Sequence, residues 1–465
     1  MKLRILESQW TPFVNALCAR RDVESAGIIL AERLHGGEAL LAKQLLLVPN
    51  DGYLVRRIDQ LRIDPIALNR LIRAARDSGL SVFTVHTHPG ATQPWFSRAD
   101  DIGDAKLMPS LFTQMPGPHG SMVIAGNTGI TTARAWLENG SQTKVDINII
   151  GKAPHFPTGS GGANSQSMFA RQRLALGNDG QEILKNLHVA IVGLGGTGSV
   201  SFVQLAHLGV GHISVVDGDL VESSNVSRII GATVADIGNT YKVDVAARYA
   251  ASLGLGTKVT PMRGHLGGEF STQSIEGCDI ILSCVDRHIP RAVINRLAYA
   301  KAIPTIDMGS AFRIGADGKI SGGAGRVVVI GPERRCLACW GHIDPHRMRV
   351  EALPPAERAK ETAEGYIEGA DIPQPSVIAF NTAVAGAAVT ELLRLVTRFG
   401  GHEDPPMRLS FDFLSGTIRR NTLVASISCK ICLATNNEAE RFDSNDIENR
   451  LNNSDNTFSQ ESESE

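Results

Sequence analysis

The chain has 465 residues and a formal net charge of -2, with 46 Lys and Arg against 48 Asp and Glu. This length exceeds one ordinary hydrophobic core and predicts two or three domains, while the balanced charge argues against nucleic acid as the main partner. No apolar run reaches membrane-spanning length, and the opening MKLRILESQWTPF lacks the apolar core of a signal peptide. We therefore expect a cytoplasmic protein that does not enter a membrane.

Residues 1–150 predict a small mixed α/β domain. Four strand-like runs lie at residues 26–32, 39–49, 81–89 and 121–126. A helix-period segment, DPIALNRLIRAARDSGL, separates the second run from the third. Asp64 and Pro65 have the positions of an N-cap and a first-turn proline, and Gly79 has that of a C-terminal glycine.

The run HTHPGATQPWFSRADD carries the chemistry of this domain. Alternate side chains of an extended strand share a face, so His86 and His88 present two imidazoles to one ion. Asp100 is placed to return as a third ligand, which on zinc leaves one position for water. The plain alternative is a pair of polar residues on a sheet face.

The same stretch resembles the JAB/JAMM metalloprotease family, whose signature is an upstream Glu, then HxHP, then SxxD. Glu24 stands in ESAGIIL, and Ser97 to Asp100 supply SxxD. The resemblance implies that both histidines and Asp100 bind a catalytic zinc, that Glu24 is general base to the zinc-bound water, and that Ser97 helps to hold the oxyanion. The interval before Ser97 exceeds the family's usual spacing, which leaves Asp101 as an alternative ligand.

Residues 151–168, GKAPHFPTGSGGANSQSM, have no apolar period and predict a flexible linker. A second domain is expected over 169–435, followed by a disordered acidic tail over 436–465. Within the second domain, the charged and proline-rich segment 342–375 predicts a long functional connection. It leads into a helix rich in small residues that is expected to end at Gly400 and to pack closely, in a dimer among other arrangements.

The second domain opens on a stretch typical of a nucleotide site, LHVAIVGLGGTGSVSFVQLAHLGVGHISVVDGD. It predicts a strand, a glycine loop, a helix from about Thr197 and a second strand that ends at Asp217. Glycines let the backbone approach a phosphate, and the helix start points free N–H groups at it. The loop glycines are Gly193, Gly195, Gly196 and Gly198. Taken alone, this pattern fits a dinucleotide dehydrogenase, with Asp217 on the ribose of NAD.

The residues beyond Asp217 favour a triphosphate instead. The continuation DxDxVxxSNxxR supplies Asp219, Asn225 and Arg228, and further along stand Lys242 in DIGNTYK and Asp286 in CVDRHIPRAVIN. Two cations and an extra carboxylate suit ATP with magnesium better than a pyrophosphate bridge.

With these motifs, the chain from about 169 to 432 resembles the ThiF/MoeB-type adenylyltransferases related to ubiquitin-activating enzymes. The resemblance implies a Rossmann-like α/β domain after the JAB/JAMM-type domain, and ATP with magnesium as cofactors. Asp217 would bind the ribose, Asp286 would hold magnesium, and Arg171 would reach the phosphates, commonly those of the partner subunit of a homodimer. The phosphates would also be held by Asn225, Arg228 and Lys242. Arg287 departs from the Asn that the family commonly places after its aspartate.

Two CxxC pairs stand far apart in the second domain, at Cys336 and Cys339 and at Cys429 and Cys432. In a reducing compartment they predict a closed four-thiolate zinc, which is structural because no coordination position stays open. The remaining cysteines are expected to be core residues: Cys18, Cys278 and Cys284.

An activating half and a hydrolytic half have one natural common substrate, the flexible C-terminus of a ubiquitin-like protein. The expected function is adenylation of that carboxylate plus zinc-dependent cleavage after it, in bacterial conjugation pathways that include antiviral defence and a ubiquitin-conjugating-enzyme-like partner. The alternative within the same chemistry is activation of a sulfur-carrier protein for cofactor or cysteine biosynthesis. An NAD-dependent oxidoreductase and an inactive scaffold that binds the ubiquitin-like protein remain as alternatives of other classes.

Thioester-forming relatives carry a nucleophilic cysteine between the nucleotide site and the second CxxC pair. No cysteine occurs between Cys339 and Cys429. We therefore expect the product to remain an adenylate until a partner's thiol or persulfide takes it, or to pass to a hydroxyl such as Ser376, which is first of all a helix N-cap by position.

Overall fold

The structure is a computed structural model that describes residues 1–36, 38–158, 167–267, 272–364, 367, 375–399, 401, 408–422 and 429–433. The chain divides into two compact units, Met1–Pro157 and Thr158–Glu465, which we call unit 1 and unit 2. Residues 151–157 of the expected linker belong to unit 1, where Phe156 is buried and His155 bridges to Ile149. The expected acidic tail lies outside the described residues.

Unit 1 is a closed barrel of seven strands in the order β1-β3-β2-β6-β7-β8-β9. The strands are β1 (Lys2–Leu6), β2 (Ala26–Arg33), β3 (Ala39–Leu47), β6 (Ser81–His88), β7 (His119–Ala125), β8 (Thr131–Trp136) and β9 (Gln142–Ile150). Three helices, α1 (Glu7–Cys18), α2 (Pro65–Ser78) and α3 (Arg98–Phe112), and a hairpin of β4 (Tyr53–Arg56) and β5 (Leu61–Ile63) complete the unit. The four predicted strands are confirmed as β2, β3, β6 and β7.

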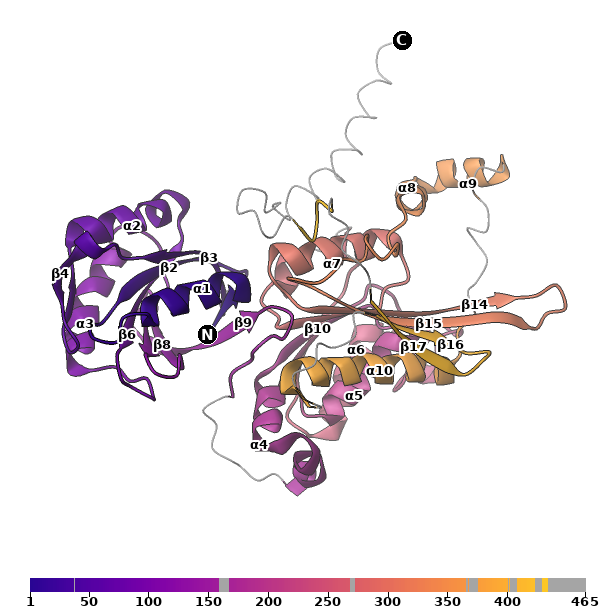
Figure 1. Ribbon diagram of the computed structural model, residues 1–465. Coiled ribbons are helices and arrows are strands. Elements are labelled where there is room, and N and C mark those ends of the chain that lie inside the picture. Colours follow the sequence, from indigo (N-terminus) through magenta and orange to yellow (C-terminus); the bar gives the residue numbers. More distant parts are fainter. Residues whose placement is uncertain are drawn as a thin grey trace, which may run out of the picture. The chain divides into compact units, whose positions relative to one another are not determined.

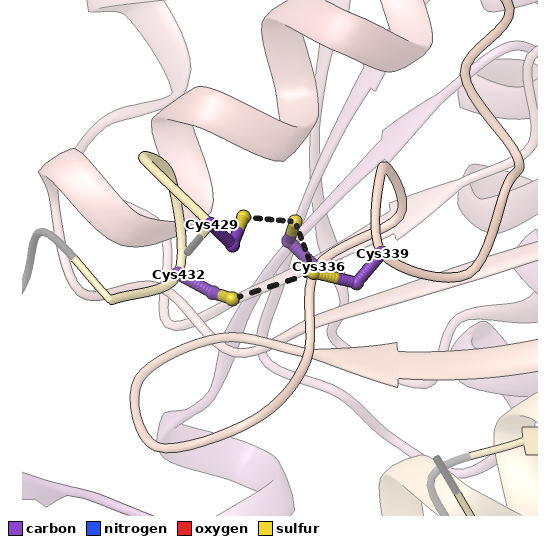
Figure 2. A group of neighbouring side chains, drawn as sticks. All are labelled: Cys336, Cys339, Cys429 and Cys432. Atoms are coloured by element: carbon purple, nitrogen blue, oxygen red, sulfur yellow. Dashed lines mark hydrogen bonds between the residues drawn. The ribbon is translucent and has the colours of Figure 1, made fainter. Parts of the chain in front are cut away.

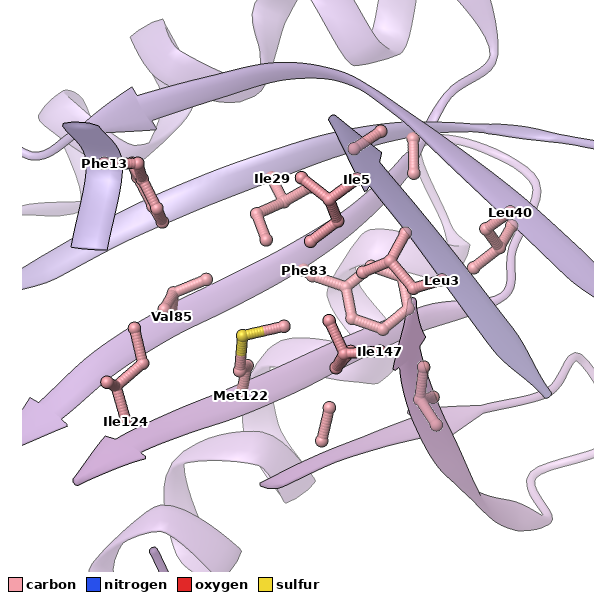
Figure 3. Close-up of a cluster of buried hydrophobic side chains, with 14 of the residues drawn as sticks. Leu3, Ile5, Phe13, Ile29, Leu40, Phe83, Val85, Met122, Ile124 and Ile147 are labelled. Atoms are coloured by element: carbon pink, nitrogen blue, oxygen red, sulfur yellow. The ribbon is translucent and has the colours of Figure 1, made fainter. Parts of the chain in front are cut away.

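Alternate residues of every barrel strand fill the interior of unit 1 (Figure 3). Leu3 and Ile5 of β1, for example, pack with Phe83 and Val85 of β6, and Phe13 of α1 joins the same cluster. Side chains of the opposite parity pack instead against α2 and α3, on the outer face. The period of two along each strand therefore decides which side chains face the interior and which face the helices.

The caps of α2 agree with the prediction from sequence. The carboxylate of Asp64 accepts the backbone N–H of Ile66, and Pro65 occupies the first turn. Gly79 ends the helix in a left-handed conformation with φ of 63°. These local signals fix where the helix begins and ends.

Unit 2 is built on an eight-stranded sheet in the order β12-β11-β10-β13-β14-β15-β16-β17. Its strands are β10 (His188–Val192), β11 (His212–Val216), β12 (Lys258–Met262), β13 (Ile280–Ser283), β14 (Thr305–Ile314), β15 (Ile320–Ile330), β16 (Arg408–Asp412) and β17 (Thr417–Asn421). Its helices are α4 (Ala170–Asn186), α5 (Gly196–His207), α6 (Lys242–Leu253), α7 (His288–Ala300), α8 (Pro345–Ala352), α9 (Pro355–Ala363) and α10 (Ile378–Thr397). The first five strands in this order are parallel and the rest pair antiparallel.

The strand order reverses direction at β10, which pairs with both β11 and β13. Figure 1 shows α7 on one face of the sheet and α5, α6 and α10 on the other. In open α/β sheets a ligand binds outside the carboxyl ends of the strands at such a reversal. The glycine loop that follows β10 lies at this position.

Helix α10 has the length and mean hydropathy of a membrane span, but 44% of its apolar window is buried in the protein. It packs on α5, β14 and β15, and Gly386 lies near Gln204 of α5. Its small residues thus serve packing within the chain. The helix ends at Thr397 because Arg398, with φ of 54°, turns the chain, and the predicted terminator Gly400 lies outside the described residues.

Candidate functional site

The structure brings three predicted metal ligands together at the end of β6. His86 Nε2 lies 3.1 Å from His88 Nε2 and 3.1 Å from Asp100 Oδ1, and His88 Nε2 lies 3.8 Å from Asp100 Oδ2. All three ligand atoms are within 4.8 Å of one another. A tetrahedral zinc with bonds of about 2.0–2.1 Å separates its ligand atoms by about 3.3 Å, so this set fits zinc.

Helix α3 supplies the third ligand through its first turn. Ser97 is the N-cap: its hydroxyl accepts the backbone N–H of Asp100, and the Asp100 carboxylate accepts the backbone N–H of Ser97 at 2.6 Å. This capping box fixes the orientation of Asp100. The alternative ligand, Asp101, instead pairs with Arg134 at 2.6 Å. Ser97 therefore has a structural role in addition to the oxyanion role expected from sequence.

The ligands of this site differ in the direction in which their pKa values are shifted and in how their side chains pack. Burial opposes ionisation of Asp100, but the hydrogen bond and charge of His86 outweigh it and hold the pKa of Asp100 below its ordinary value. Burial lowers the pKa of His88, which favours the neutral, metal-binding imidazole. Trp95 packs against the His88 ring with centroids 4.8 Å apart and holds it in place.

Glu24 stands beside this site and is only 8% exposed. Its pKa is raised to about 7, chiefly by burial, with the charge of His86 opposing the rise and the charges of Asp100 and Asp59 adding to it. Its backbone N–H donates to the carbonyl of Arg57, and its own carbonyl accepts Arg56 Nε. A carboxyl group with a pKa near neutrality is suited to exchange protons with water.

Four cysteines of unit 2 form the second candidate metal centre (Figure 2). The sulfur atoms of Cys336 and Cys339 are 3.7 Å apart, those of Cys336 and Cys429 are 3.6 Å apart, and those of Cys339 and Cys432 are 3.7 Å apart. None of the four forms a disulfide. A tetrahedral zinc with Zn–S bonds of about 2.3 Å separates its sulfurs by about 3.8 Å, so this set fits a closed structural zinc.

The glycine loop after β10 is closely packed against its surroundings. Gly193 has φ of 88°, and a Cβ on Gly198 would lie 1.9 Å from the Gly193 carbonyl oxygen. The loop is also held by Asp217, whose carboxylate accepts the backbone N–H groups of Leu194 and Asp219. Asp217 therefore couples the end of β11 to the loop, a role that sequence reasoning had assigned to ribose binding alone.

One polar residue behind the loop, Asn381, was missed by sequence reasoning. Asn381 of α10 is buried, and its amide nitrogen would lie 2.1 Å from a Cβ on Gly196. It donates to Ser376 Oγ at 3.0 Å and accepts from Ser310 Oγ at 3.1 Å. A lone Asn in the apolar run IAFNTAVAG was the available signal. Ser376 is therefore not a side-chain N-cap: α10 begins after Val377, with no capping side chain.

The residues expected to hold phosphates differ in whether their side chains already have partners in the protein. Lys242 is buried and its ammonium contacts both Asp219 and Asp217, the latter at 3.7 Å. The Arg228 guanidinium makes one hydrogen bond, to the carbonyl of Ser224, and no ion pair to any described carboxylate. Asn225 is 4% exposed; its Nδ2 donates to Ser224 Oγ at 3.1 Å, and its Oδ1 has no partner among the described residues. The Arg228 guanidinium is thus available to a phosphate, whereas the donor of Asn225 is already in use and Lys242 is already neutralised.

Asp286 and Arg171 are both exposed, and their side chains make no hydrogen bond or ion pair within the described chain. Asp286 follows β13, two residues after Cys284, whose carbonyl oxygen lies 2.9 Å from an ideal Cβ on Gly193. It is therefore next to the glycine loop. Arg171 lies in the first turn of α4, and nothing places it at the loop. Burial raises the pKa of Cys284 well above its usual range, which makes this thiol a poor nucleophile.

Two family models match the chain, one in each unit. Residues 7–138 match the prokaryotic homologs of the JAB domain, and residues 169–431, more than half of the chain, match the ThiF family. The N-terminal domain is thus JAB-like and the second is of the ThiF type, as the sequence motifs predicted.

Curated relatives match only part of this chain. The adenylyltransferase and sulfurtransferase uba4 of Aspergillus clavatus is 28% identical over 273 residues, which are 57% of this chain and 51% of the relative. The SAMP-activating enzyme E1 of Haloferax volcanii is 32% identical over 35% of this chain and 57% of its own. The molybdopterin-synthase adenylyltransferase of Salmonella typhimurium is 34% identical over 31% and 59%. The chain spans about half the length of the curated relatives it matches.

Among solved structures, E. coli MccB with ATP aligns to 58% of this chain and 76% of its own, with a TM-score of 0.46 and 18% identity.

Proposed function

Because the chain belongs to the ThiF family and carries a JAB-like domain before it, we propose that it adenylates the C-terminal carboxylate of a ubiquitin-like protein and also cleaves the bond that this terminus forms. The cofactors would be ATP, magnesium and two zinc ions, one catalytic and one structural. The enzyme would be cytoplasmic, as expected from the sequence. It would act as a homodimer in which Arg171 reaches the phosphates in the partner's site.

The adenylation proposal is carried by one observation, the set of unused polar groups around the glycine loop. Arg228 lies against α5, since its carbonyl accepts Ser199 Oγ, and its guanidinium has no described carboxylate partner. Asp286 lies across the loop, after β13, also without a partner. The first turn of α5 adds backbone N–H groups. A cation, a carboxylate and a helix start around one loop suit a nucleoside triphosphate with its metal.

In the proposed reaction a carboxylate oxygen of the substrate tail attacks the α-phosphorus, and the bond from that phosphorus to pyrophosphate breaks. Magnesium, when bound, neutralises charge on the phosphate oxygens. Arg228 donates to the same oxygens, and Asp286 positions the metal. Asp217 accepts from Leu194 N–H and keeps the loop in shape. Lys242 reaches a phosphate only by leaving Asp217 or Asp219.

For the JAB-like domain we propose hydrolysis of the peptide or isopeptide bond that follows the ubiquitin-like terminus. Zinc, when bound by His86, His88 and Asp100, supplies a water of lowered pKa. In the hydrolysis the water oxygen would bond to the carbonyl carbon and the C–N bond would break, while Glu24 accepts the proton of the water and passes it to the leaving amine. Its buried position, which raises its pKa to about 7, supports this role.

The activated product would not be transferred to a cysteine of this chain. Cys284 is the thiol beside the loop, and its pKa is raised by burial. The four thiols of the CxxC pairs are gathered in one cluster. Ser376 Oγ lies 3.4 Å from an ideal Cβ on Gly196 and is the alternative acceptor on this chain. We propose that a partner's thiol or persulfide takes the adenylate.

A second candidate has a specific observation in its favour: two matched relatives are named as a sulfurtransferase and a molybdopterin-synthase adenylyltransferase. Activation of a sulfur-carrier protein would use the same adenylation residues. To distinguish the two candidate functions, the adenylate is supplied either with a persulfide donor or with a ubiquitin-conjugating-enzyme-like protein. A thiocarboxylate product selects the sulfur carrier, and a protein conjugate selects the modifier.

The test of adenylation is ATP–pyrophosphate exchange with magnesium and each ubiquitin-fold protein encoded in the same genome. Exchange that requires one such protein and falls in Arg228→Gln supports the proposal. Tight NAD binding without exchange would overturn it in favour of an oxidoreductase, and binding of the ubiquitin-fold protein without ATP turnover would identify a scaffold.

A further inference from the structure

A second group of cations lies on the face of the unit 2 sheet that carries α7. Asp307 of β14 is fully buried, and its carboxylate accepts Arg291 Nε at 3.2 Å, Arg326 Nη2 at 3.1 Å and Ser283 Oγ at 2.8 Å. Arg326 lies on β15, and the next strand, β16, adds Arg408, which interacts electrostatically with Arg326 and has no ion pair to any described carboxylate. Asp307 pairs with two of these three arginines, so the described group carries an excess of positive charge.

Four buried nitrogens of Arg326, Arg408 and two residues near them lack a hydrogen-bond partner in the described chain. They are Arg326 Nε, Trp340 Nε1, His342 Nε2 and Arg408 Nε. The Arg408 guanidinium lies over the Trp340 ring at 5.7 Å from its centroid. Burial and the charge of Arg326 lower the pKa of His342 to about 4, so its ring is neutral at physiological pH. We call these four residues the arginine site.

Leaving such groups unpaired is costly. An unsatisfied buried polar group costs about 1–3 kcal/mol, more if it is charged, and folded proteins keep few of them. Burial and the nearby charge of Arg326 also lower the pKa of Arg408, which shows that this guanidinium is held in an unfavourable field. An anion at the site would satisfy the donors and offset the excess charge together.

The arginine site adjoins the segment that runs to the glycine loop. Asp307 joins it to Ser283, the last residue of β13, and Arg291 donates to the Val285 carbonyl at 2.7 Å. The next residue is Asp286, the proposed magnesium ligand. A polypeptide whose terminal carboxylate lies at the loop can therefore pass the arginine site a few residues earlier.

We propose that the arginine site binds a carboxylate side chain in the tail of the protein substrate, upstream of the terminal carboxylate that is activated. This inference rests on the proposed function and deepens it, because it makes an acidic residue near the C-terminus a condition for recognition. The planar donor forks of Arg326 and Arg408 match a carboxylate, and Trp340 Nε1 adds a single donor. A neutral amide at that position offers one acceptor oxygen instead of two and carries no charge, so it satisfies fewer of the donors and leaves the positive charge in excess.

The test uses pairs of short synthetic peptides with free C-terminal carboxylates, in which one internal position is Glu or Gln. The position is moved along the peptide, and binding to the full chain is measured by fluorescence anisotropy without ATP. At one position the Glu peptide should bind about ten-fold more tightly, the effect of one charge-assisted hydrogen bond. Arg408→Gln should abolish this preference, and Arg420→Gln, an exposed arginine on the neighbouring strand β17, should retain it.

Equal binding of Glu and Gln peptides at every position, or a preference that survives in Arg408→Gln, would overturn the arginine site. Zinc content and circular dichroism check that Arg408→Gln is folded; if it is not, Trp340→Phe removes one donor while keeping a ring, and must weaken the preference. Pyrophosphate exchange with the same peptides separates the two proposals. A Glu preference without exchange contradicts adenylation and leaves the arginine site, whereas exchange without the preference contradicts the arginine site alone.

Discussion

Replacing Gly198 by Ala should disrupt the glycine loop from within. The new Cβ would lie 1.9 Å from the Gly193 carbonyl oxygen, whereas non-bonded heavy atoms prefer about 3.5 Å, so one of them must move by about 1.5 Å. Gly193 cannot yield easily, because its N–H donates to Val216 at 2.8 Å and its φ is 88°. Overpacking of this kind costs about 1–3 kcal/mol.

Hydrogen exchange of peptides from β10 and α5 measures this cost locally. Where exchange reports the opening equilibrium, a loss of about 1–3 kcal/mol in local stability increases the exchange rate by a factor between about 5 and about 150. Gly195→Ala is the matched control, because a Cβ there meets nothing within 4 Å and its φ is -69°. Gly195→Ala should keep wild-type exchange and lose only ATP affinity. Unchanged exchange in Gly198→Ala, or equal loss in both variants, would refute the reasoning.

The two metal centres and both reactions give further predictions. Cys336→Ser should release one of two zinc ions and lower the thermal midpoint of unfolding, because it opens the four-thiolate cluster. His88→Ala should release the other zinc and abolish only cleavage. Unchanged zinc in either variant by elemental analysis contradicts this assignment. Glu24→Gln should retain zinc but lose cleavage of a ubiquitin-like fusion, since an amide cannot accept the proton, and retained cleavage would count against the JAB-type mechanism. Asp286→Ala should lower magnesium-dependent pyrophosphate exchange by about 100-fold to 1,000-fold, with the exposed Asp317→Ala as control, and equal exchange in both would remove Asp286 from the site.

Local signals in the sequence were sufficient for several parts of the fold. The caps of α2, the strand that carries His86 and His88, and the strand, loop and helix around Gly198 are each set by residues a few positions apart. Such features depend on backbone preference and periodicity, which a sequence displays directly. The two metal clusters follow from the same logic once the CxxC pairs and the HxH spacing are recognised.

Other parts depend on contacts between distant residues and could not be read locally. Barrel closure requires β1 to pair with both β3 and β9, so that Leu3 meets Leu40 and Ile147. The motif around Ser97 resembles the metalloprotease signature, but Ser97 is also the N-cap of α3. The periodicity of the sequence did not predict this helix. Asn381 reaches the glycine loop from a helix almost two hundred residues away in sequence, so no local pattern displays this contact.

Transfer of oxygen from the substrate tail to AMP tests the central claim most directly. A ubiquitin-fold protein that supports pyrophosphate exchange is labelled with ¹⁸O in its C-terminal carboxylate and incubated with the enzyme, ATP, magnesium and an acceptor thiol. If the carboxylate attacks the α-phosphorus, the bridging oxygen of the acyl-adenylate comes from the tail, and the AMP released by the thiol carries ¹⁸O. AMP or ADP that contains no oxygen from the tail would contradict adenylation and show that the unit only hydrolyses ATP.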